Sequence, residues 1–322
     1  MNGPLVTVVI PAYRAAEYLP DTVARLARQE FADFEVVIVE DGSGDETADV
    51  ARGLDRRYER VRAIVLSVNG GVARARRRAV DEATGEYLWF VDADDTWPDD
   101  ALVILADLAR ESRADVVVAG AEFVYQDGGR RPIAAPQSAP VTGPEAFGML
   151  LRGELTGHLW NKLFRRSVMQ QCSFAPARVQ SDLIMVADAL SHADRVVFSP
   201  SSVYEYRLRP GSIITSTSKR AESLAIIDEA VRADAERLGL TASEDYRYFR
   251  ARYIQLSGIK DALLAPYDPV ERAAHLSARR RSLTAADVWL FARRRDARRF
   301  ALAATAKTSV RAHRALLKAA ER

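Results

Sequence analysis

The chain has 322 residues, of which 48% are hydrophobic and 28% are charged, and its net charge is +2. This length exceeds the usual size of a single hydrophobic core, so we expect one large domain with an appendage, or two domains. The composition is typical of a soluble globular protein and excludes fibrous and disordered classes. Cys172 is the single cysteine and cannot form an internal disulfide, which fits a reducing compartment. Because we find neither a signal peptide nor an apolar run as long as a membrane span, we expect a cytoplasmic protein.

Strand and helix signals alternate along the first 124 residues. Short runs rich in β-branched and aromatic residues predict strands at 5–11, 34–41, 61–67, 85–92 and 114–124. Helical spacing predicts helices at 15–29, 43–58, 71–83 and 98–113. Strands that are apolar throughout and separated by helices indicate an α/β fold, with a mostly parallel sheet covered by helices on both faces.

The remaining chain changes character twice. Residues 127–144 are rich in proline and glycine and predict a long mobile loop. Residues 147–167 and 181–198 then predict a helix, a short strand, a second helix and a strand. From about residue 221 the composition becomes Ala, Arg and Leu with few β-branched residues, which predicts a helical C-terminal region over 221–322.

The ends of the predicted strands are polar. They read PAYR, EDGSGDE, SVNGGVAR and DADDT, and ligands bind beyond the carboxyl ends of strands in parallel sheets. Neither EDGSGDE nor NGGVAR supplies the G-x-G-x-x-G pattern, which disfavours a dinucleotide-binding fold. The last strand end places Asp92, Asp94 and Asp95 within four residues. Carboxylates this close repel one another unless a positive charge lies among them.

The residues alone leave three interpretations of this acidic cluster. In the first, the carboxylates favour the N-terminus of the helix that starts near Pro98. In the second, VDADDT satisfies the D-x-D-x-T pattern of haloacid-dehalogenase-like phosphohydrolases with Asp92 as the nucleophile, although that motif normally ends the first strand. In the third, a D-x-D motif holds Mg²⁺ or Mn²⁺, which prefers oxygen ligands and keeps positions open for a substrate diphosphate.

Taken together, these segments resemble glycosyltransferase family 2, the inverting nucleotide-sugar enzymes with the GT-A fold. The resemblance is carried in order by VVIPAYRAAEYLPDTVARLARQEFADFEVVIVEDGSGDET, NGGVARARRRAVDEATGEYLWFVDADD, WNKLFRRS, SDLIM and YEYRLRPGSI. It implies a GT-A domain over residues 1–220, with a nucleotide-sugar-binding half at 1–120 and an acceptor half at 121–220. It also implies transfer from a nucleoside-diphosphate sugar, with a UDP-sugar as the first donor to test.

The resemblance assigns the nucleotide contacts to the first two strand ends and to one helix. The loop that packs on the base corresponds to Pro11, Ala12 and Tyr13. Asp41 corresponds to the acid that accepts a hydrogen bond from a pyrimidine ring N–H. Glu40 stands where the family usually has Asp. Arg76 corresponds to the helix arginine near the base and the phosphates.

The resemblance also divides the acidic motif. Asp92 corresponds to the ribose side and Asp94 to the ligand of a Mn²⁺ or Mg²⁺ ion, with Asp92 as a second metal ligand and Asp95 supporting the loop. The cation would draw charge from the diphosphate as it leaves, which is Lewis-acid catalysis without a protein nucleophile.

An inverting transfer needs a base that takes the proton from the acceptor hydroxyl. The resemblance places that base at Asp182, which is preceded by Ser181 where the family usually has Glu. Arg207 and Ser212 match the segment that closes over the diphosphate, since arginine grips phosphate oxygens in a bidentate way. The departures at Glu40 and Ser181 leave a further alternative open, a catalytically degenerate nucleotide-sugar-binding scaffold.

The acceptor implied by the resemblance is a hydroxyl group. It belongs to a cell-surface glycan, a teichoic-acid-like polyol phosphate polymer, a lipid or a small molecule, and the sequence does not distinguish among these.

The last 44 residues differ electrostatically from the rest of the chain. Residues 279–322 contain 13 Arg and Lys against 3 Asp and Glu, a net charge of +10, whereas the remaining residues carry −8. A basic amphipathic segment predicts peripheral contact with the inner face of a membrane, or self-association into a homo-oligomer. No nucleic-acid-binding motif accompanies it, so we expect no nucleic-acid partner.

Overall fold

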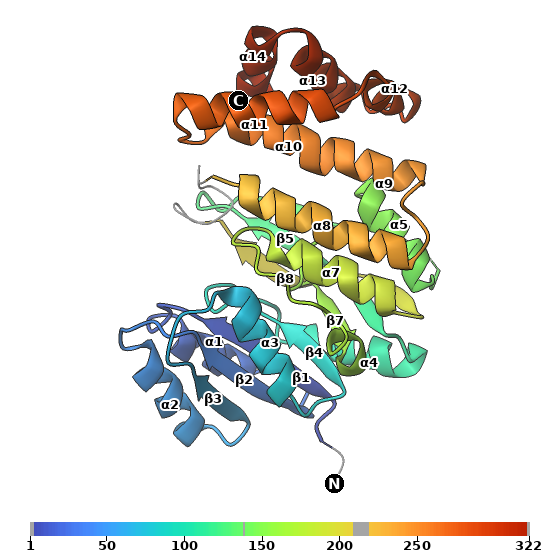
Figure 1. Ribbon diagram of the computed structural model, residues 1–322. Helices are drawn as coiled ribbons and strands as arrows, with labels where there is room; N and C mark the ends of the chain where they lie inside the picture. Colours follow the sequence, from blue (N-terminus) through green and yellow to red (C-terminus); the bar gives the residue numbers. More distant parts are fainter. Residues whose placement is uncertain (1–2, 138, 209–218, 321–322) are drawn as a thin grey trace. The chain divides into compact units, whose positions relative to one another are not determined.

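The computed structural model describes residues 3–137, 139–208 and 219–320. The chain divides into two compact units. The first comprises the described residues within Met1–Phe147 and Leu155–Ser212, and the second comprises those within Gly148–Glu154 and Ile213–Arg322. Figure 1 labels most of their strands and helices.

The first unit is built on one sheet. Its strand order is β3-β2-β1-β4-β7-β5-β6, and β8 pairs with β5. The strands are β1 (Val6–Ala12), β2 (Phe34–Glu40), β3 (Val61–Val65), β4 (Tyr87–Phe90), β5 (Val116–Val124), β6 (Arg130–Ile133), β7 (Lys162–Arg165) and β8 (Val196–Arg207). Strands β1 to β4 pair in parallel, whereas β7 runs antiparallel to both β4 and β5. The predicted mostly parallel sheet is confirmed.

Helices surround this sheet. They are α1 (Leu19–Leu26), α2 (Thr47–Arg57), α3 (Val72–Glu82), α4 (Ala101–Ser112), α6 (Arg166–Met169), α7 (Ser181–His192) and the part of α5 (Gly143–Arg152) that ends at Phe147. Apolar side chains of α1, α2 and α4 share one core with alternate residues of β1 and β2. Helix α3 packs on β1 and β2 through its own buried side chains, which are not part of that core. The alternation of side chains along each strand therefore supplies apolar surface to both faces.

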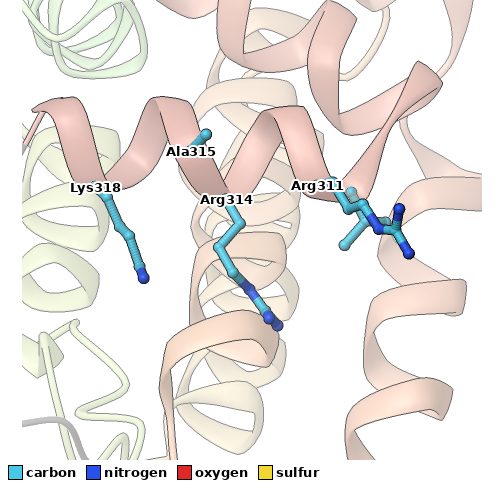
Figure 2. Close-up of a pocket in the computed structure, with 5 residues that line it drawn as sticks. Arg311, Arg314, Ala315 and Lys318 are labelled. Atoms are coloured by element: carbon cyan, nitrogen blue, oxygen red, sulfur yellow. The ribbon is translucent and has the colours of Figure 1, made fainter.

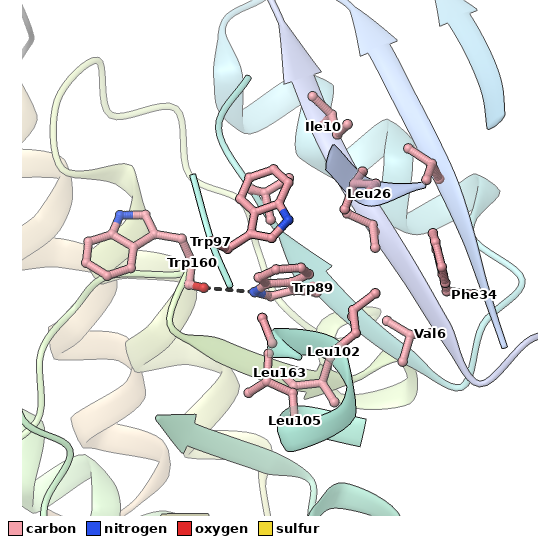
Figure 3. Packing of buried hydrophobic residues seen from close by; sticks show 14 of the residues in the cluster. Val6, Ile10, Leu26, Phe34, Trp89, Trp97, Leu102, Leu105, Trp160 and Leu163 are labelled. Atoms are coloured by element: carbon pink, nitrogen blue, oxygen red, sulfur yellow. Dashed lines mark hydrogen bonds between the residues drawn. The ribbon is translucent and has the colours of Figure 1, made fainter. Parts of the chain in front are cut away.

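The large core centres on Trp89 of β4. Figure 3 shows its indole beside Val6 of β1 and Leu102 of α4, and its Nε1 donates a 2.8 Å hydrogen bond to the carbonyl oxygen of Trp160. The indole is fully buried, so this bond satisfies the one polar atom of the side chain. Because β4 contributes such large apolar residues, its carboxyl end is held rigidly between β1 and β7.

The loop predicted for residues 127–144 is partly wrong. Residues 130–133 form strand β6, which pairs antiparallel with β5, and residues from Gly143 onward form α5. Gly128 turns the chain with a φ of +83°, a conformation that favours glycine. Arg130 then forms ion pairs with Glu122 of β5 at 2.5 Å and Glu205 of β8 at 2.7 Å. Cross-strand charge pairing stabilises a short strand whose composition is that of a loop.

The second unit is helical, as predicted. Its helices are α8 (Ala221–Arg237), α9 (Glu244–Phe249), α10 (Ser257–Leu264), α11 (Pro269–Ser282), α12 (Ala285–Arg293), α13 (Ala297–Thr308) and α14 (Val310–Ala320), with a π-helical segment at Arg250–Leu256. Buried residues including Ile259, Leu290 and Phe291 form its core. Over the described residues, no helix combines the length and the hydropathy that crossing a membrane requires.

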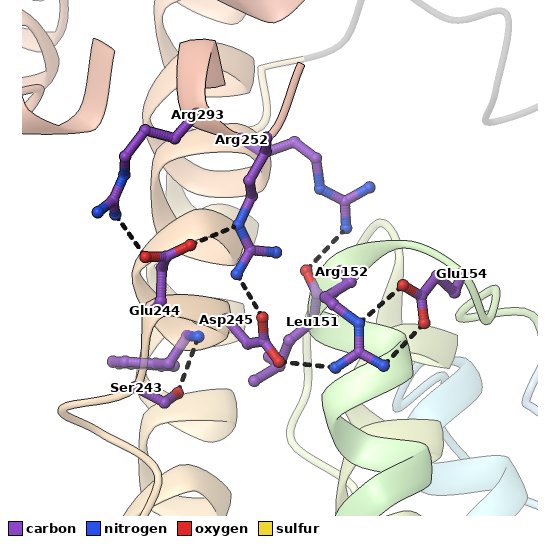
Figure 4. Close-up of polar contacts among 10 residues, drawn as sticks. Leu151, Arg152, Glu154, Ser243, Glu244, Asp245, Arg252 and Arg293 are labelled. Atoms are coloured by element: carbon purple, nitrogen blue, oxygen red, sulfur yellow. Dashed lines mark hydrogen bonds and ion pairs between the residues drawn. The ribbon is translucent and has the colours of Figure 1, made fainter. Parts of the chain in front are cut away.

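Ion pairs tie residues 148–154 into the second unit. Asp245 accepts hydrogen bonds from Arg152 at 2.7 Å and from Arg294 at 2.5 Å, and Figure 4 shows it beside Arg152. Glu154 forms a bidentate pair with Arg152 at 2.7 and 2.8 Å. Bidentate arginine–carboxylate geometry is the most specific form of ion pair, so this cluster fixes the place of the segment.

Candidate active site

The acidic residues lie in a tight turn after β4. A hydrogen bond of 3.3 Å from the amide of Asp95 to the carbonyl oxygen of Asp92 closes that turn. The side chain of Asp92 is 33% exposed, whereas Asp95 is only 4% exposed. Asp94 is partly exposed. The turn thus presents Asp92 and Asp94 to solvent and keeps Asp95 inside.

Arg76 of α3 joins this turn to α7. Its guanidinium is buried, with Nη1 at 2.6 Å from Oδ1 of Asp182 and Nη2 at 3.6 Å from Oδ1 of Asp92. Burial disfavours a charged guanidinium, but the two carboxylates outweigh it and raise the pKa of Arg76. The sequence placed Arg76 near the base and the phosphates, and the structure places its charge between two candidate site carboxylates.

The carboxyl group of Asp92 is withdrawn from water and lies near two other carboxylates. Withdrawal from water, followed by the charges of Asp182 and Asp94, raises the pKa of Asp92 to about 6, although Arg76 opposes the shift. Burial and the two neighbouring carboxylates together outweigh the effect of the Arg76 guanidinium on Asp92. An additional positive charge at this turn would stabilise the ionised form of Asp92.

Asp182 occupies the first turn of α7. The residue before the helix, Gln180, has a φ of +60°, in the left-handed region. The partial positive charge at a helix N-terminus favours an anionic side chain there. Asp182 remains 24% exposed while it is bound to Arg76, so one side of the carboxylate faces solvent. A partly exposed carboxylate held by one fixed partner can accept a proton from a bound hydroxyl.

The predicted base-binding residues meet at the carboxyl ends of β1 and β2. Ala12 is paired in register with Glu40, and the amide of Asp41 donates to the carbonyl oxygen of Ala12 at 2.9 Å. Pro11 lies in β1, and Tyr13 follows the strand with 48% of its surface exposed. The parallel pairing of these strands accounts for the grouping.

Asp41 and Glu40 both hold glycine-containing turns. The carboxylate of Asp41 is buried and accepts from the amides of Gly70 at 2.9 Å and Gly71 at 2.7 Å. Glu40 accepts from the amides of Gly42 and Ser43 in its own turn. Glu40 is thus a turn-forming residue. The role of Asp41 toward a nucleotide base stays a prediction.

The end of β8 lies against the acidic turn. The amide of Arg207 donates to Oδ1 of Asp95 at 3.0 Å, and its Nε donates to the hydroxyl of Thr96 at 3.3 Å. Arg207 is otherwise exposed. Ser212, the other residue assigned to the diphosphate, lies outside the described residues.

Trp160 is a core residue. It is 3% exposed and stacks between His158, at a centroid distance of 4.6 Å, and Tyr204, at 4.8 Å. Burial and then the charge of Lys162 lower the pKa of His158 to about 4, so the ring is neutral near pH 7.

Lys162 is a functional candidate that the sequence did not assign. It is fully buried, and its Nζ donates to the carbonyl oxygen of His158 at 2.6 Å and to Oδ1 of Asn161 at 2.9 Å. Burial lowers the pKa of Lys162 to about 7, and Asp182 opposes that shift. Its contacts fix the segment before β7. The sequence offers no signal for this role, since an isolated lysine at a strand start is usually exposed.

A family model described as "Glycosyl transferase family 2" matches residues 7–172, more than half of the chain. The chain belongs to glycosyltransferase family 2. The matched residues include the acidic turn, Arg76 and Asp41, so the site described above lies largely inside the family region.

Two relatives of this glycosyltransferase come from Bacillus subtilis. The uncharacterized glycosyltransferase EpsJ is 27% identical over 83% of this chain and 80% of its own length. The putative teichuronic acid biosynthesis glycosyltransferase TuaG is 30% identical over 68% of this chain and 85% of its own length.

Solved structures show the same fold at lower identity. Residues 1–349 of Staphylococcus aureus TarS, in complex with UDP-GlcNAc, are 20% identical with a TM-score of 0.64, covering 98% of this chain and 91% of that one. The mannosyltransferase PcManGT of Pyrobaculum calidifontis, in complex with GDP-Man and Mn²⁺, is 19% identical with a TM-score of 0.56, covering 99% and 86%. The fold of this glycosyltransferase is therefore the GT-A fold.

The acidic turn of the glycosyltransferase fits a divalent cation in its donor chemistry. Asp92 and Asp94 supply the oxygen ligands that Mn²⁺ and Mg²⁺ prefer, and burial followed by the neighbouring charges of Asp182 and Asp94 raises the pKa of Asp92. Within residues 3–137, 139–208 and 219–320, no group of three or more Asp, Glu, His or Cys side chains gathers into a metal site. A cation held by Asp92 and Asp94 would take its other ligands from substrate oxygens or water.

Proposed function

We propose that this glycosyltransferase transfers a sugar from a nucleoside-diphosphate sugar, with UDP-sugars as the first donors to test, to a hydroxyl acceptor with inversion at the anomeric carbon. The observation that carries the proposal is the bridge formed by Arg76. It holds the carboxylate at the end of β4 and the carboxylate at the start of α7 on one guanidinium. A donor-side acid and a candidate base are thereby held in fixed positions near each other.

The proposed reaction is a single displacement. Asp182 takes the proton of the acceptor hydroxyl, the hydroxyl oxygen attacks the anomeric carbon, and the bond from that carbon to the diphosphate oxygen breaks. Arg76 orients Asp182 and occupies one of its oxygens, which leaves the exposed side of the carboxylate for the acceptor. A fixed base contributes through orientation as well as through proton transfer.

On the donor side, residues of the strand ends bind the nucleotide. Asp41 accepts a ring N–H of the base, and the residues packed on that base are Pro11, Ala12 and Tyr13. Arg207 grips the diphosphate, with Ser212 as its partner. Asp92 and Asp94 would hold Mn²⁺ or Mg²⁺, which supplies Lewis-acid stabilisation of the leaving diphosphate when bound. The UDP-GlcNAc complex of TarS supports UDP as the nucleotide.

We propose that the enzyme acts in the synthesis of a cell-envelope polysaccharide, which supplies the acceptor hydroxyl. The names of relatives support this, since TuaG is described as a teichuronic acid biosynthesis enzyme. Residues 1–120 would bind the donor and residues 121–220 the acceptor, with residues 221–322 as a separate helical region.

The sequence also left two alternative functions open, a phosphohydrolase and a donor-binding scaffold. The family match and the position of Asp92 after the fourth strand oppose a phosphohydrolase. A scaffold that binds donor without turnover is tested by the Asp182 variant.

Donor and cation are identified together by thermal melting. We expect UDP with Mn²⁺ or Mg²⁺ to raise the melting temperature, with a stabilisation of about 2.7 kcal/mol at free ligand near 100 Kd. Asp94→Asn is expected to remove the cation-dependent part of this shift, because the amide is a far weaker ligand than the carboxylate. The matched control is Asp99→Asn, whose exposed side chain lies near Arg28 at 3.9 Å. A shift that is equal in EDTA would contradict the proposed metal site.

We also propose that residues 279–322 attach the enzyme to an anionic membrane surface. Arg311, Arg314 and Lys318 are exposed on one face of α14, and together with Val310 and Ala315 they line a pocket of about 290 Å³. Figure 2 shows the long side chains of the three cations projecting to one side of the helix. Elsewhere in this segment, Trp289 is 68% exposed, and exposed tryptophan favours the membrane interface.

Vesicle co-sedimentation tests the membrane proposal. Reversing charge in the triple variant Arg311→Glu, Arg314→Glu, Lys318→Glu is expected to weaken binding to phosphatidylglycerol vesicles on the order of 100-fold, since each basic residue contributes about 1 kcal/mol. A triple Arg→Glu variant at the exposed positions Arg52, Arg56 and Arg57 makes the same change of charge on α2 and should bind as the wild type does. Equal losses in both triple variants would refute a specific role of α14. Concentration-dependent sedimentation without lipid would indicate self-association instead.

A further inference from the structure

The hydroxyl of Tyr204 lies between the acidic turn and the end of β8. It accepts a 3.0 Å hydrogen bond from the amide of Asp92 and donates a 3.0 Å bond to Oδ2 of Asp95. Tyr204 is fully buried, so water does not compete for either bond. One phenol thus spans the turn from its first carboxylate to its last.

Packed rings fix the position of this hydroxyl. The Tyr204 ring stacks on Trp160 at 4.8 Å with an interplanar angle of 13°, and on Trp97 at 5.8 Å with an angle of 29°. It also meets Trp89 edge-on at 6.3 Å. Contact with indoles on three sides leaves the phenol no room to change rotamer. The hydroxyl therefore holds its two hydrogen-bond partners in the acidic turn in fixed positions.

The carboxylate of Asp95 links the hydroxyl of Tyr204 to Arg207 through hydrogen bonds. One carboxylate oxygen accepts from Tyr204 and the other accepts from the amide of Arg207 at 3.0 Å. The next residue of the turn, Thr96, forms paired backbone hydrogen bonds with Glu205 at 3.3 and 2.8 Å, and its hydroxyl accepts from Nε of Arg207. Backbone and guanidinium of Arg207 are thus both set by the turn that carries Asp92 and Asp94.

We propose that Tyr204 is a positioning residue of the transfer reaction, which acts through Asp95 to place the Arg207 guanidinium relative to Asp92 and Asp94. This inference rests on the proposed function. The physical reason is geometric: a group that stabilises a leaving diphosphate acts only from the correct place, and a displacement of about 1 Å can lower turnover up to 100-fold. Tyr204 does not touch the substrate in this account.

A double-mutant cycle tests whether Tyr204 acts through Arg207. The four proteins are the wild type, Tyr204→Phe, Arg207→Ala and the double variant, assayed for kcat and KM with a UDP-sugar and Mn²⁺. Tyr204→Phe keeps the stacked ring and removes the hydroxyl, and we expect kcat to fall about tenfold. In the Arg207→Ala background the same change should lower kcat by less than about twofold. Full additivity of the two losses would overturn the proposal.

Tyr87→Phe is the control for a general loss of stability. Tyr87 is also a buried tyrosine of the same sheet, and its hydroxyl contacts the carbonyl oxygen of Ala114 at 3.1 Å and the guanidinium of Arg165 at 2.5 Å. It begins β4, at the opposite end of the strand from the acidic turn. We expect Tyr87→Phe to lower the melting temperature and leave kcat unchanged. Equal losses of kcat in the two tyrosine variants would show that Tyr204 is merely structural.

Amide hydrogen exchange measures, without any ligand, how stable the hydrogen bonds of the Asp92 and Arg207 amides are. Tyr204→Phe is expected to speed exchange of the Asp92 and Arg207 amides about tenfold, while the Gly71 amide, bound to Asp41, keeps its wild-type rate. If the wild type turns over no sugar nucleotide, the proposed function fails and exchange alone decides whether the turn is held by Tyr204. Unchanged exchange at both amides would overturn the inference independently of activity.

Discussion

Replacing Asp182 with asparagine is expected to lower kcat on the order of 1,000-fold, because an amide cannot take the proton of the acceptor hydroxyl. The substitution is nearly isosteric, and its remaining oxygen can still accept the bond that Arg76 donates at 2.6 Å. We therefore expect the Kd for UDP to stay close to wild type, whereas the melting temperature falls because the buried guanidinium loses one of its two carboxylates. Steady-state kinetics with a UDP-sugar, together with calorimetric titration of UDP, give the two quantities separately.

The matched control is Asp194→Asn, an exposed aspartate that follows the end of α7. It should leave both kcat and Kd unchanged. If Asp182→Asn retains turnover, another group is the base and our mechanism is wrong. If the wild type binds UDP but transfers no sugar to any acceptor, the scaffold alternative gains support.

Replacing Arg76 with methionine is expected to destabilise the first unit by about 3 kcal/mol, the scale measured when one partner of a buried ion pair is removed. The side chain is 5% exposed and contacts two carboxylates, which would lose their counterion together. Urea unfolding followed by circular dichroism measures the change in free energy. Loss of turnover should accompany it, since neither Asp92 nor Asp182 is then held in place.

The destabilisation by Arg76→Met should depend on pH in a defined direction. The folded-state pKa of Asp92 is about 6 against an ordinary value of 3.8, and removing Arg76 raises it further. A carboxyl group with a raised folded-state pKa binds more protons when folded, so stability falls as pH rises through that range. The difference between variant and wild type should therefore widen above about pH 6.

Arg78→Met provides the control on the same helix. Arg78 is 49% exposed and pairs with Glu82 four residues later, so its loss should cost no more than about 1 kcal/mol at any pH. A pH-independent loss in Arg76→Met would argue against Asp92 as the group that responds. Equal losses in the two arginine variants would contradict a special role for the buried position.

Local sequence pattern suggested those candidate site residues that follow the predicted strands. Apolar runs that end in polar residues identify Asp41 and Asp92, because parallel strands bring all their carboxyl ends to one edge of the sheet. Asp182 and Arg207 became candidates because they stand at the corresponding positions of the family's motifs. Motifs did not reveal that Arg76 contacts Asp182, since 106 residues separate the two and no periodicity connects them.

The pairing of the strands after β4 also could not be predicted from the local sequence pattern. The short strand β7 runs antiparallel between β4 and β5, and it places Lys162 in the interior of the unit. The Pro/Gly-rich composition of residues 127–144 predicted a loop, whereas charge pairs from Arg130 to two other strands stabilise β6. Such pairings depend on non-local contacts, whose free energy no window of sequence contains.

By itself, therefore, the sequence determined the alternation of strands and helices, the polar edge of the sheet, the acidic turn and the basic helical C-terminus. Only the tertiary structure decided which charges compensate one another and what holds the turn. Arg76 pairs with carboxylates from two elements, and Tyr204 reaches the turn from a strand more than 100 residues further along the chain. The physical reason is that buried charges and hydroxyls take whatever partners the packed fold brings within hydrogen-bonding distance.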